Sequence, residues 1–168
     1  MNLRLGVVVA SLGIAAYLAI AGCAPKAQQE TQVATEASPL AQGVKAVKRE
    51  TWVSEPFSLE DSAEVRVGVA LTSGPAIDVY VLSEAGFNRW NTLVSKAQES
   101  EDQTFEHFPS LGLEGLSASF TSEWNELPAG TYYLVIDNTS FGGTSPPSPG
   151  NDDIATVSYQ IEARPLSE

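Results

Sequence analysis

The sequence alternates apolar and polar residues along several short runs, and this two-residue period limits the fold more than any other feature. Residues 63–71, AEVRVGVAL, place Val65, Val67 and Val69 on one side of an extended chain. Such alternation is typical of β-strands with one buried face. We therefore expect a strand here and at three further runs with the same alternation, namely residues 77–82, 132–137 and 155–163.

Two weaker runs, residues 52–59 and 116–126, bring the expected total to about six to eight strands, enough for two packed antiparallel sheets. The predicted fold class is an all-β sandwich with a jelly-roll-like arrangement. A turn signal at residues 73–75, Ser-Gly-Pro, separates the first two strong runs and predicts a hairpin between them.

The segment at residues 84–100, EAGFNRWNTLVSKAQES, departs from the strand pattern. Its apolar residues Phe87, Trp90 and Leu93 recur at helical spacing. The sequence therefore predicts a short helical excursion near residues 85–100 in an otherwise all-β domain.

The N-terminal residues have the pattern of an export signal. Arg4 supplies a positive charge and residues 5–22 carry none, so a short basic region precedes an apolar one. Cys23, the only cysteine in the chain, follows directly. Residues 20–23, Ile-Ala-Gly-Cys, resemble the lipobox of bacterial lipoproteins, in which small residues precede a cysteine that becomes the new N-terminus.

This resemblance implies cleavage before Cys23, diacylglycerol on the Cys23 sulfur, and acylation of the new amine, with palmitate as a representative acyl group. Two or more acyl chains hold a protein stably on a membrane, because each buried methylene contributes about 0.8 kcal/mol. The expected location is the cell envelope, where the protein is anchored in the lipid bilayer on the extracytoplasmic side. Two alternatives stay open: a secretory signal in which Cys23 is incidental, and an uncleaved membrane helix.

Residues 24–46 are rich in Ala, Gln, Thr, Ser and Pro and contain no aromatic side chain. This composition is typical of a flexible linker. The expected organisation is a lipoprotein signal peptide at residues 1–22, a lipidated Cys23 with a tether at residues 23–49, and a β-sandwich domain at residues 50–168.

The chain is acidic, with 21 Asp and Glu residues against 9 Lys and Arg residues and a net charge of −12. A surface of this sign repels nucleic acid, so we expect no nucleic-acid partner. Its simplest role is solubility near a membrane, and the alternative is attraction of cations or basic partners. Because 43% of the residues are hydrophobic, the chain has enough apolar surface to form a core.

Two segments carry a second family resemblance. Residues 78–82, DVYVL, and residues 127–138, LPAGTYYLVIDN, are similar to strands of pre-peptidase C-terminal domains and, more loosely, of GOLD-type sandwiches. The resemblance covers approximately residues 52–163. It implies a jelly-roll-like sandwich that serves as a non-catalytic module for interaction with proteins or other envelope components.

The residue inventory gives little support for catalysis. A serine-type site needs a base, usually histidine, and the only histidine, His107, lies in an acidic segment, so we expect no enzyme. Calcium is a different case, because it takes oxygen ligands from carboxylates and amides. Asp137, Asn138, Asp152 and Asp153 would form a calcium site if the strand end met the following loop, and otherwise they cap turns.

Aromatic side chains suggest a third kind of site. Trp90, Trp124 and Tyr133 are candidate ligand-binding residues, since exposed rings form stacking platforms for sugars. Such residues more often fill a core or its rim. The alternative to an interaction module is therefore a carbohydrate-binding or calcium-binding sandwich at the cell surface.

Overall fold

The computed structural model describes residues 36–96, 104–143 and 153–166. Every strand pairing in it is antiparallel. The elements are β1 (Ser38–Lys48), β2 (Trp52–Leu59), β3 (Ala63–Ser73), β4 (Ile77–Ser83), α1 (Glu84–Ser95), the 3-10 helix η1 (Pro109–Leu111), β5 (Leu113–Leu116), β6 (Ser119–Thr121), β7 (Asn125–Leu127), β8 (Gly130–Asp137) and β9 (Ile154–Pro165).

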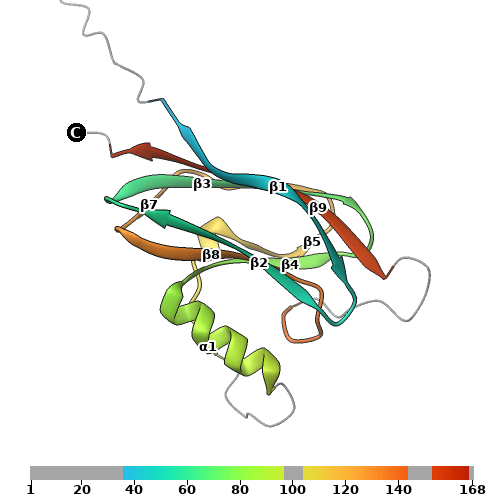
Figure 1. The fold of residues 1–168 in the computed structure, drawn as a ribbon. Coiled ribbons are helices and arrows are strands. Elements are labelled where there is room, and N and C mark those ends of the chain that lie inside the picture. The colour runs from blue at the N-terminus through green and yellow to red at the C-terminus, as the bar shows by residue number, and fades with distance from the viewer. Residues whose placement is uncertain (1–35, 97–103, 144–152, 167–168) are drawn as a thin grey trace, which may run out of the picture. The chain divides into compact units, whose positions relative to one another are not determined.

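The strands form two packed sheets, as Figure 1 shows. The first sheet has the order β1-β9-β3-β6, with β7 also paired to β3, and the second has the order β2-β8-β4-β5. The predicted all-β, two-sheet sandwich is confirmed. Helix α1 lies against the outer face of the second sheet, the face that points away from the first sheet (Figure 1).

The main core lies between the sheets and comes from the alternating residues of the strong runs. On β3, Val65, Val67 and Val69 are buried, while the residues between them are partly exposed. The inward residues of β8 and β9 are buried in the same core; on β9 the residues between them are more exposed, whereas on β8 Val135 and Asp137 are buried on the opposite face as well. Each fully buried Val, Leu or Ile side chain contributes about 1.5–3 kcal/mol relative to an exposed one, so these strands supply most of the driving force for the sandwich.

Strand β1 overturns the expected start of the domain. Residues 38–48 belong to the predicted tether, but they form a strand that pairs with β9 along nearly its whole length. The composition was misleading because the inward positions of β1 include small residues, Ala41 and Gly43. Gly43 faces the ring of Tyr159, which fills the space that a side chain there would need. The domain therefore includes β1.

The predicted hairpin between the runs at residues 63–71 and 77–82 is wrong. The two runs belong to different sheets, because β3 lies in the first and β4 in the second. Gly74 in the connection has a φ of 99°, a conformation that favours glycine, and a Cβ there would collide with the backbone at Ile154. The turn residues therefore carry the chain from one sheet to the other.

The excursion after β4 forms the expected helix over Glu84–Ser95, and residues 97–100 of the predicted range lie outside the described residues. Ser83 caps α1, since its hydroxyl accepts a hydrogen bond of 3.1 Å from the amide of Gly86. Trp90 and Leu93 are buried on the side that faces the sheet. Among the described residues, no helix is long and apolar enough to cross a membrane. The apolar run at residues 5–22 and the expected lipid attachment at Cys23 lie outside them.

Candidate functional site

Two acidic residues lie directly opposite each other on the outer face of the second sheet. Asp78 of β4 is the register partner of Asp137 of β8, and their exposed fractions are 0% and 1%. Both follow the alternation that also places Tyr80 and Val135 on this face. Directly opposite residues on one face have Cβ atoms about 4.5–5.5 Å apart, so the register forces the two carboxyl groups into proximity.

One oxygen of each aspartate accepts a hydrogen bond from a backbone amide, but the second oxygen of Asp137 does not. Asp78 Oδ1 accepts a bond of 2.7 Å from the amide of Gly115, and Asp137 Oδ1 accepts one of 2.9 Å from the amide of Thr139. The second oxygen of Asp137, Oδ2, is buried and has no hydrogen-bond partner in the described part of the chain. A buried polar atom without a partner costs free energy, so this oxygen calls for an explanation.

Burial changes the protonation of the groups on this face. It raises the pKa of Asp137 to about 6, an effect that hydrogen bonds from Thr139 oppose and the charges of Asp78 and Glu50 reinforce. Burial also raises the pKa of Tyr80 well above its usual value, and the carboxylates of Asp78 and Glu114 add to the effect. Negative charge on this face is therefore costly, and a proton or a cation would relieve it.

Tyr80 links the acidic pair to a surface hollow. Its hydroxyl donates a hydrogen bond of 3.2 Å to Glu114 Oε1, and its ring meets His107 edge-on with centroids 5.6 Å apart. The hollow has a volume of about 410 Å³, and Val79, Pro109 and Leu113 contribute to its walls. His107 is half-buried in this wall.

A short segment, residues 139–143, folds over the acidic pair and is here called the covering loop. The hydroxyl of Thr139 accepts a hydrogen bond of 3.1 Å from the amide of Phe141. Gly142 lies so close to the sheet that a Cβ there would collide with the carboxylate of Asp78 and the hydroxyl of Tyr80. Only a glycine allows the backbone to come this near to the carboxylate.

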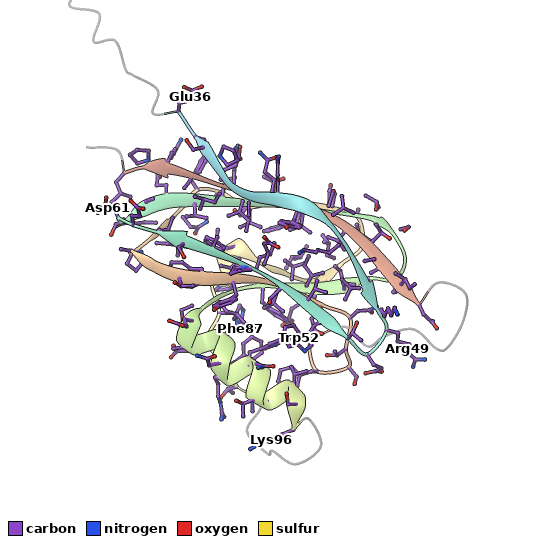
Figure 2. All side chains as sticks on the ribbon, viewed as in Figure 1. Glu36, Arg49, Trp52, Asp61, Phe87 and Lys96 are labelled. Carbon is purple, nitrogen blue, oxygen red and sulfur yellow. The ribbon has the colours of Figure 1, made fainter. Side chains whose placement is uncertain are left out.

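Aromatic rings fill the space between α1 and the second sheet. Trp90 is fully buried there, with an exposed fraction of 0%, so it is not the solvent-facing platform that the sequence suggested. Tyr133 stacks on Phe87 with centroids 4.1 Å apart, which covers one face of its ring. Figure 2 shows Phe87 and Trp52 on this side of the sandwich, where Trp52 also packs edge-on against Trp90. These rings form a second core.

Trp124 lies elsewhere, beside the outer face of the first sheet. Its ring lies between two guanidinium groups, 4.6 Å from that of Arg66 and 4.4 Å from that of Arg164. Each arginine pairs with a glutamate directly across the β3–β9 ladder, Arg66 with Glu162 and Arg164 with Glu64. The three candidate ligand-binding residues therefore do not form one strip.

The structure also separates the residues suggested for calcium. Asp137 belongs to the outer face, whereas Asn138 points the other way and donates hydrogen bonds to the backbone oxygens of Val47, at 3.2 Å, and Asp153, at 3.3 Å. The strand end and Asp153 meet through the amide nitrogen of Asn138, while its Oδ1 is buried and has no hydrogen-bond partner among the described residues. Asp152 lies outside the described residues. Within these residues, no three Asp, Glu, His or Cys side chains converge closely enough to hold a metal on their own.

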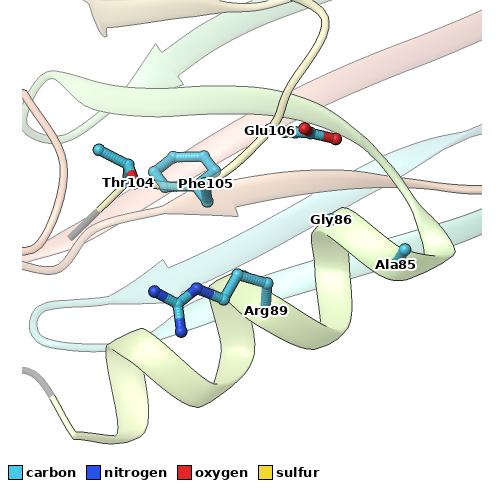
Figure 3. A pocket seen from close by; sticks show the side chains of 6 residues that line it. All are labelled: Ala85, Gly86, Arg89, Thr104, Phe105 and Glu106. Carbon is cyan, nitrogen blue, oxygen red and sulfur yellow. The ribbon is translucent and has the colours of Figure 1, made fainter. Parts of the chain in front are cut away.

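A second hollow, of about 380 Å³, lies between α1 and residues 104–106. Figure 3 shows that Ala85, Gly86 and Arg89 line it from the helix and that Phe105 and Glu106 line it from the other side. A Cβ on Gly86 would collide with the backbone oxygen of Glu106, so the helix and this segment are in close contact at one end.

The acidic pair is the feature that pattern reasoning missed, although a signal was present. Asp78 interrupts the nearly continuous apolar run AIDVYVL, and Asp137 ends the run YYLVID. A scan against models of known protein families found no match, and a search of curated proteins found none. The functional argument therefore depends on these residues and their geometry.

Proposed function

We propose that the chain is a bacterial lipoprotein, held on a membrane by acylated Cys23, whose β-sandwich is a non-catalytic interaction module of the cell envelope. The observation that carries the proposal is the motif Ile-Ala-Gly-Cys at residues 20–23, directly after an uncharged run of residues 5–22. Acylation also accounts for a single cysteine in an exported chain, where a lone thiol is otherwise unusual.

The position of β1 supports an anchor close to the domain. The first strand begins at Ser38, so residues 24–37 separate it from Cys23. A fully extended chain of this length spans at most about 50 Å, at about 3.3–3.6 Å per residue. The first residue of the sandwich would thus lie no more than about 50 Å from the acylated cysteine.

The lipoprotein proposal is tested by expressing the full chain in a bacterium and separating membrane and soluble fractions. Cys23→Ser is expected to release the chain into the soluble fraction or to leave it as an uncleaved precursor. Ala24→Ser changes the neighbouring residue without removing the sulfur, and it is expected to behave as the wild type. Normal cleavage and membrane retention of Cys23→Ser would overturn the proposal.

The interaction role is supported by the outer surface of the first sheet. Val44 of the edge strand β1 has an exposed fraction of 66%, and Ile154 of the adjacent strand β9 has one of 47%. An edge strand with free backbone groups is a ready template for another chain. A photocrosslinking amino acid at residue 44 is expected to yield a discrete adduct in intact cells, and one at exposed Asp61 is the control. Equal, diffuse labelling at both positions would contradict the proposal that this surface binds a partner.

A carbohydrate-binding function is the alternative, and Trp124 favours it because this ring is partly exposed among charged side chains. Under this alternative, a glycan array probed with the full chain gives signals that Trp124→Ala removes. An array without any such signal removes the alternative and leaves the interaction module.

A further inference from the structure

We propose that the hollow beside Tyr80 binds a lysine side chain of a partner polypeptide. The ammonium group lies on the carboxylate of Glu114, and the alkyl stem lies against Leu113 and Pro109. The site is at the β5 edge of the second sheet. It adds a second contact surface to the proposed interaction module, and it depends neither on the lipid anchor nor on the surface around Val44.

The walls of this hollow have an apolar side and an acidic side. The volume is about 410 Å³, and Val79, Pro109 and Leu113 provide the apolar atoms. Leu113 has an exposed fraction of 41%, so its side chain is accessible to a ligand. Glu114 is exposed as well and supplies the negative charge. A lysine side chain has the same division, because an alkyl stem separates its charge from the backbone.

The charge around Tyr80 favours a cation. Its hydroxyl donates a hydrogen bond of 3.2 Å to Glu114 Oε1. Burial raises the pKa of this hydroxyl, and the negative charges of Asp78, Glu114 and Asp137 raise it further. Among the described residues, no Lys or Arg side chain lines the hollow. A ligand with a positive charge is therefore complementary to this part of the surface.

The carboxylate of Glu114 favours an ammonium group over a guanidinium group. Its Oε1 already accepts the hydrogen bond from Tyr80, and its Oε2 lies beside Gly143 of the covering loop. Arginine binds a carboxylate most strongly through two parallel hydrogen bonds, which need both oxygens. An ammonium group is a compact point charge and needs only one. Lysine therefore fits this wall better than arginine.

The neighbouring surface favours a polypeptide over a small amine. A further hollow, of about 420 Å³, adjoins the first and shares His107 and Pro109 with it. The hollow of about 380 Å³ beside α1 comes next and shares Phe105 and Glu106 with the further hollow, as Figure 3 shows for these two residues. Arg89 lines this last hollow, so the cationic group is expected at the opposite end of the row. A row of adjoining hollows suits an extended segment of chain.

The test follows the imidazole signals of His107 by proton NMR, because His107 lines the hollow and is the only histidine in the chain. The full chain in an uncharged detergent is titrated with the peptide acetyl-Gly-Lys-Gly-amide at about pH 8, where a histidine is ordinarily neutral. We expect a saturable shift with a dissociation constant of about 1–10 mM. The same peptide with norleucine in place of lysine lacks the charge and is expected to bind about fivefold more weakly or less.

Three substitutions locate the lysine. Glu114→Gln keeps an oxygen for the hydroxyl of Tyr80 but removes the charge, so it is expected to weaken binding about fivefold. Leu113→Ala shortens the exposed apolar wall and is expected to weaken binding about twofold to threefold. Glu60→Gln is the matched control, because Glu60 is an exposed carboxylate in the turn between β2 and β3, and it is expected to bind as the wild type.

Several results would overturn the proposal. Equal affinities of the lysine and norleucine peptides would reject the ionic contact, and an arginine peptide that binds more tightly would reject the choice of lysine. Unchanged affinity in Glu114→Gln would place the ligand elsewhere on the acidic surface. Tighter binding of n-butylammonium chloride than of the lysine peptide would make a free amine the ligand. The absence of a saturable shift up to about 50 mM peptide would contradict the site and leave the proposed lipid anchor unaffected.

Discussion

Gly43 on β1 lies directly opposite Tyr159 on β9, and the tyrosine ring occupies the space that a side chain at residue 43 would need. A Cβ on Gly43 would come within 2.9 Å of the Tyr159 hydroxyl. The two residues show that β1 is part of the sandwich and is adapted to its neighbour. The strand also brings Lys45 to Glu55 of β2 across the open edge between the sheets, with Nζ and Oε2 2.8 Å apart.

Gly43→Val is therefore expected to destabilise the domain by about 1–3 kcal/mol, because the added methyl groups must displace a ring packed at the core edge. Urea unfolding followed by circular dichroism measures the change. Gly68→Val is the matched control, since a Cβ at Gly68 of β3 meets only ordinary contacts at 3.8 and 4.0 Å. Equal stability of the two variants would show that β1 is not held against β9 in this way.

The salt bridge between Lys45 and Glu55 predicts a pH dependence. The hydrogen bond from Lys45 lowers the pKa of Glu55 below its usual value of 4.5. A carboxyl group with a lowered pKa stabilises the folded state above that value, and the contribution is lost as the pH falls below it. Because both side chains are partly solvated, the contribution is about 0.2–1 kcal/mol.

Glu55→Gln is accordingly expected to lower the free energy of unfolding near pH 7 and to have almost no effect near pH 3. Denaturant unfolding at the two pH values makes the comparison. A loss of stability that is the same at both values would mean that packing, rather than charge, explains the role of Glu55.

Two tryptophans with different surroundings provide a third prediction. Trp90→Ala removes a fully buried ring from the second core and is expected to cost about 3–5 kcal/mol. Trp124→Ala removes a partly exposed ring between two guanidinium groups and is expected to cost about 1–2 kcal/mol. Chemical denaturation of both variants measures the difference, and the reverse order would contradict the assignment of Trp90 to a core.

The helix cap offers a smaller and more local prediction. Ser83→Ala removes the acceptor for the Gly86 amide at the start of α1 and is expected to cost about 0.5–2 kcal/mol. Ser83→Asp restores an acceptor and is expected to recover most of that loss. Hydrogen exchange at the first turn of α1 reports the change directly, and unchanged exchange in Ser83→Ala would show that the cap does not hold the helix.

Much of the fold could be predicted from the alternation of side chains, because β3, β8 and β9 each have one clearly apolar face. Strand β1 could not, since its inward positions include the small residues Ala41 and Gly43 and the charged Lys45, and its composition matches that of a linker. The strand period also does not distinguish a hairpin from a connection between two sheets, which is why the predicted hairpin between β3 and β4 is wrong.

The candidate site depends on information that a local pattern does not contain. Asp137 was a candidate from the sequence, but its partner Asp78 is distant in the chain and meets it only through the register of β4 with β8. The burial of Trp90 likewise follows from where α1 docks, and helical spacing alone does not determine that position.

The central claim is that Cys23 is acylated and fixes this sandwich to a membrane. Intact-mass analysis of the protein purified from native membranes tests it most directly. The account predicts a chain that begins at Cys23 and carries the added mass of diacylglycerol and a fatty acyl group. A chain with an unmodified thiol at residue 23, or one that still includes residues 1–22, would contradict it.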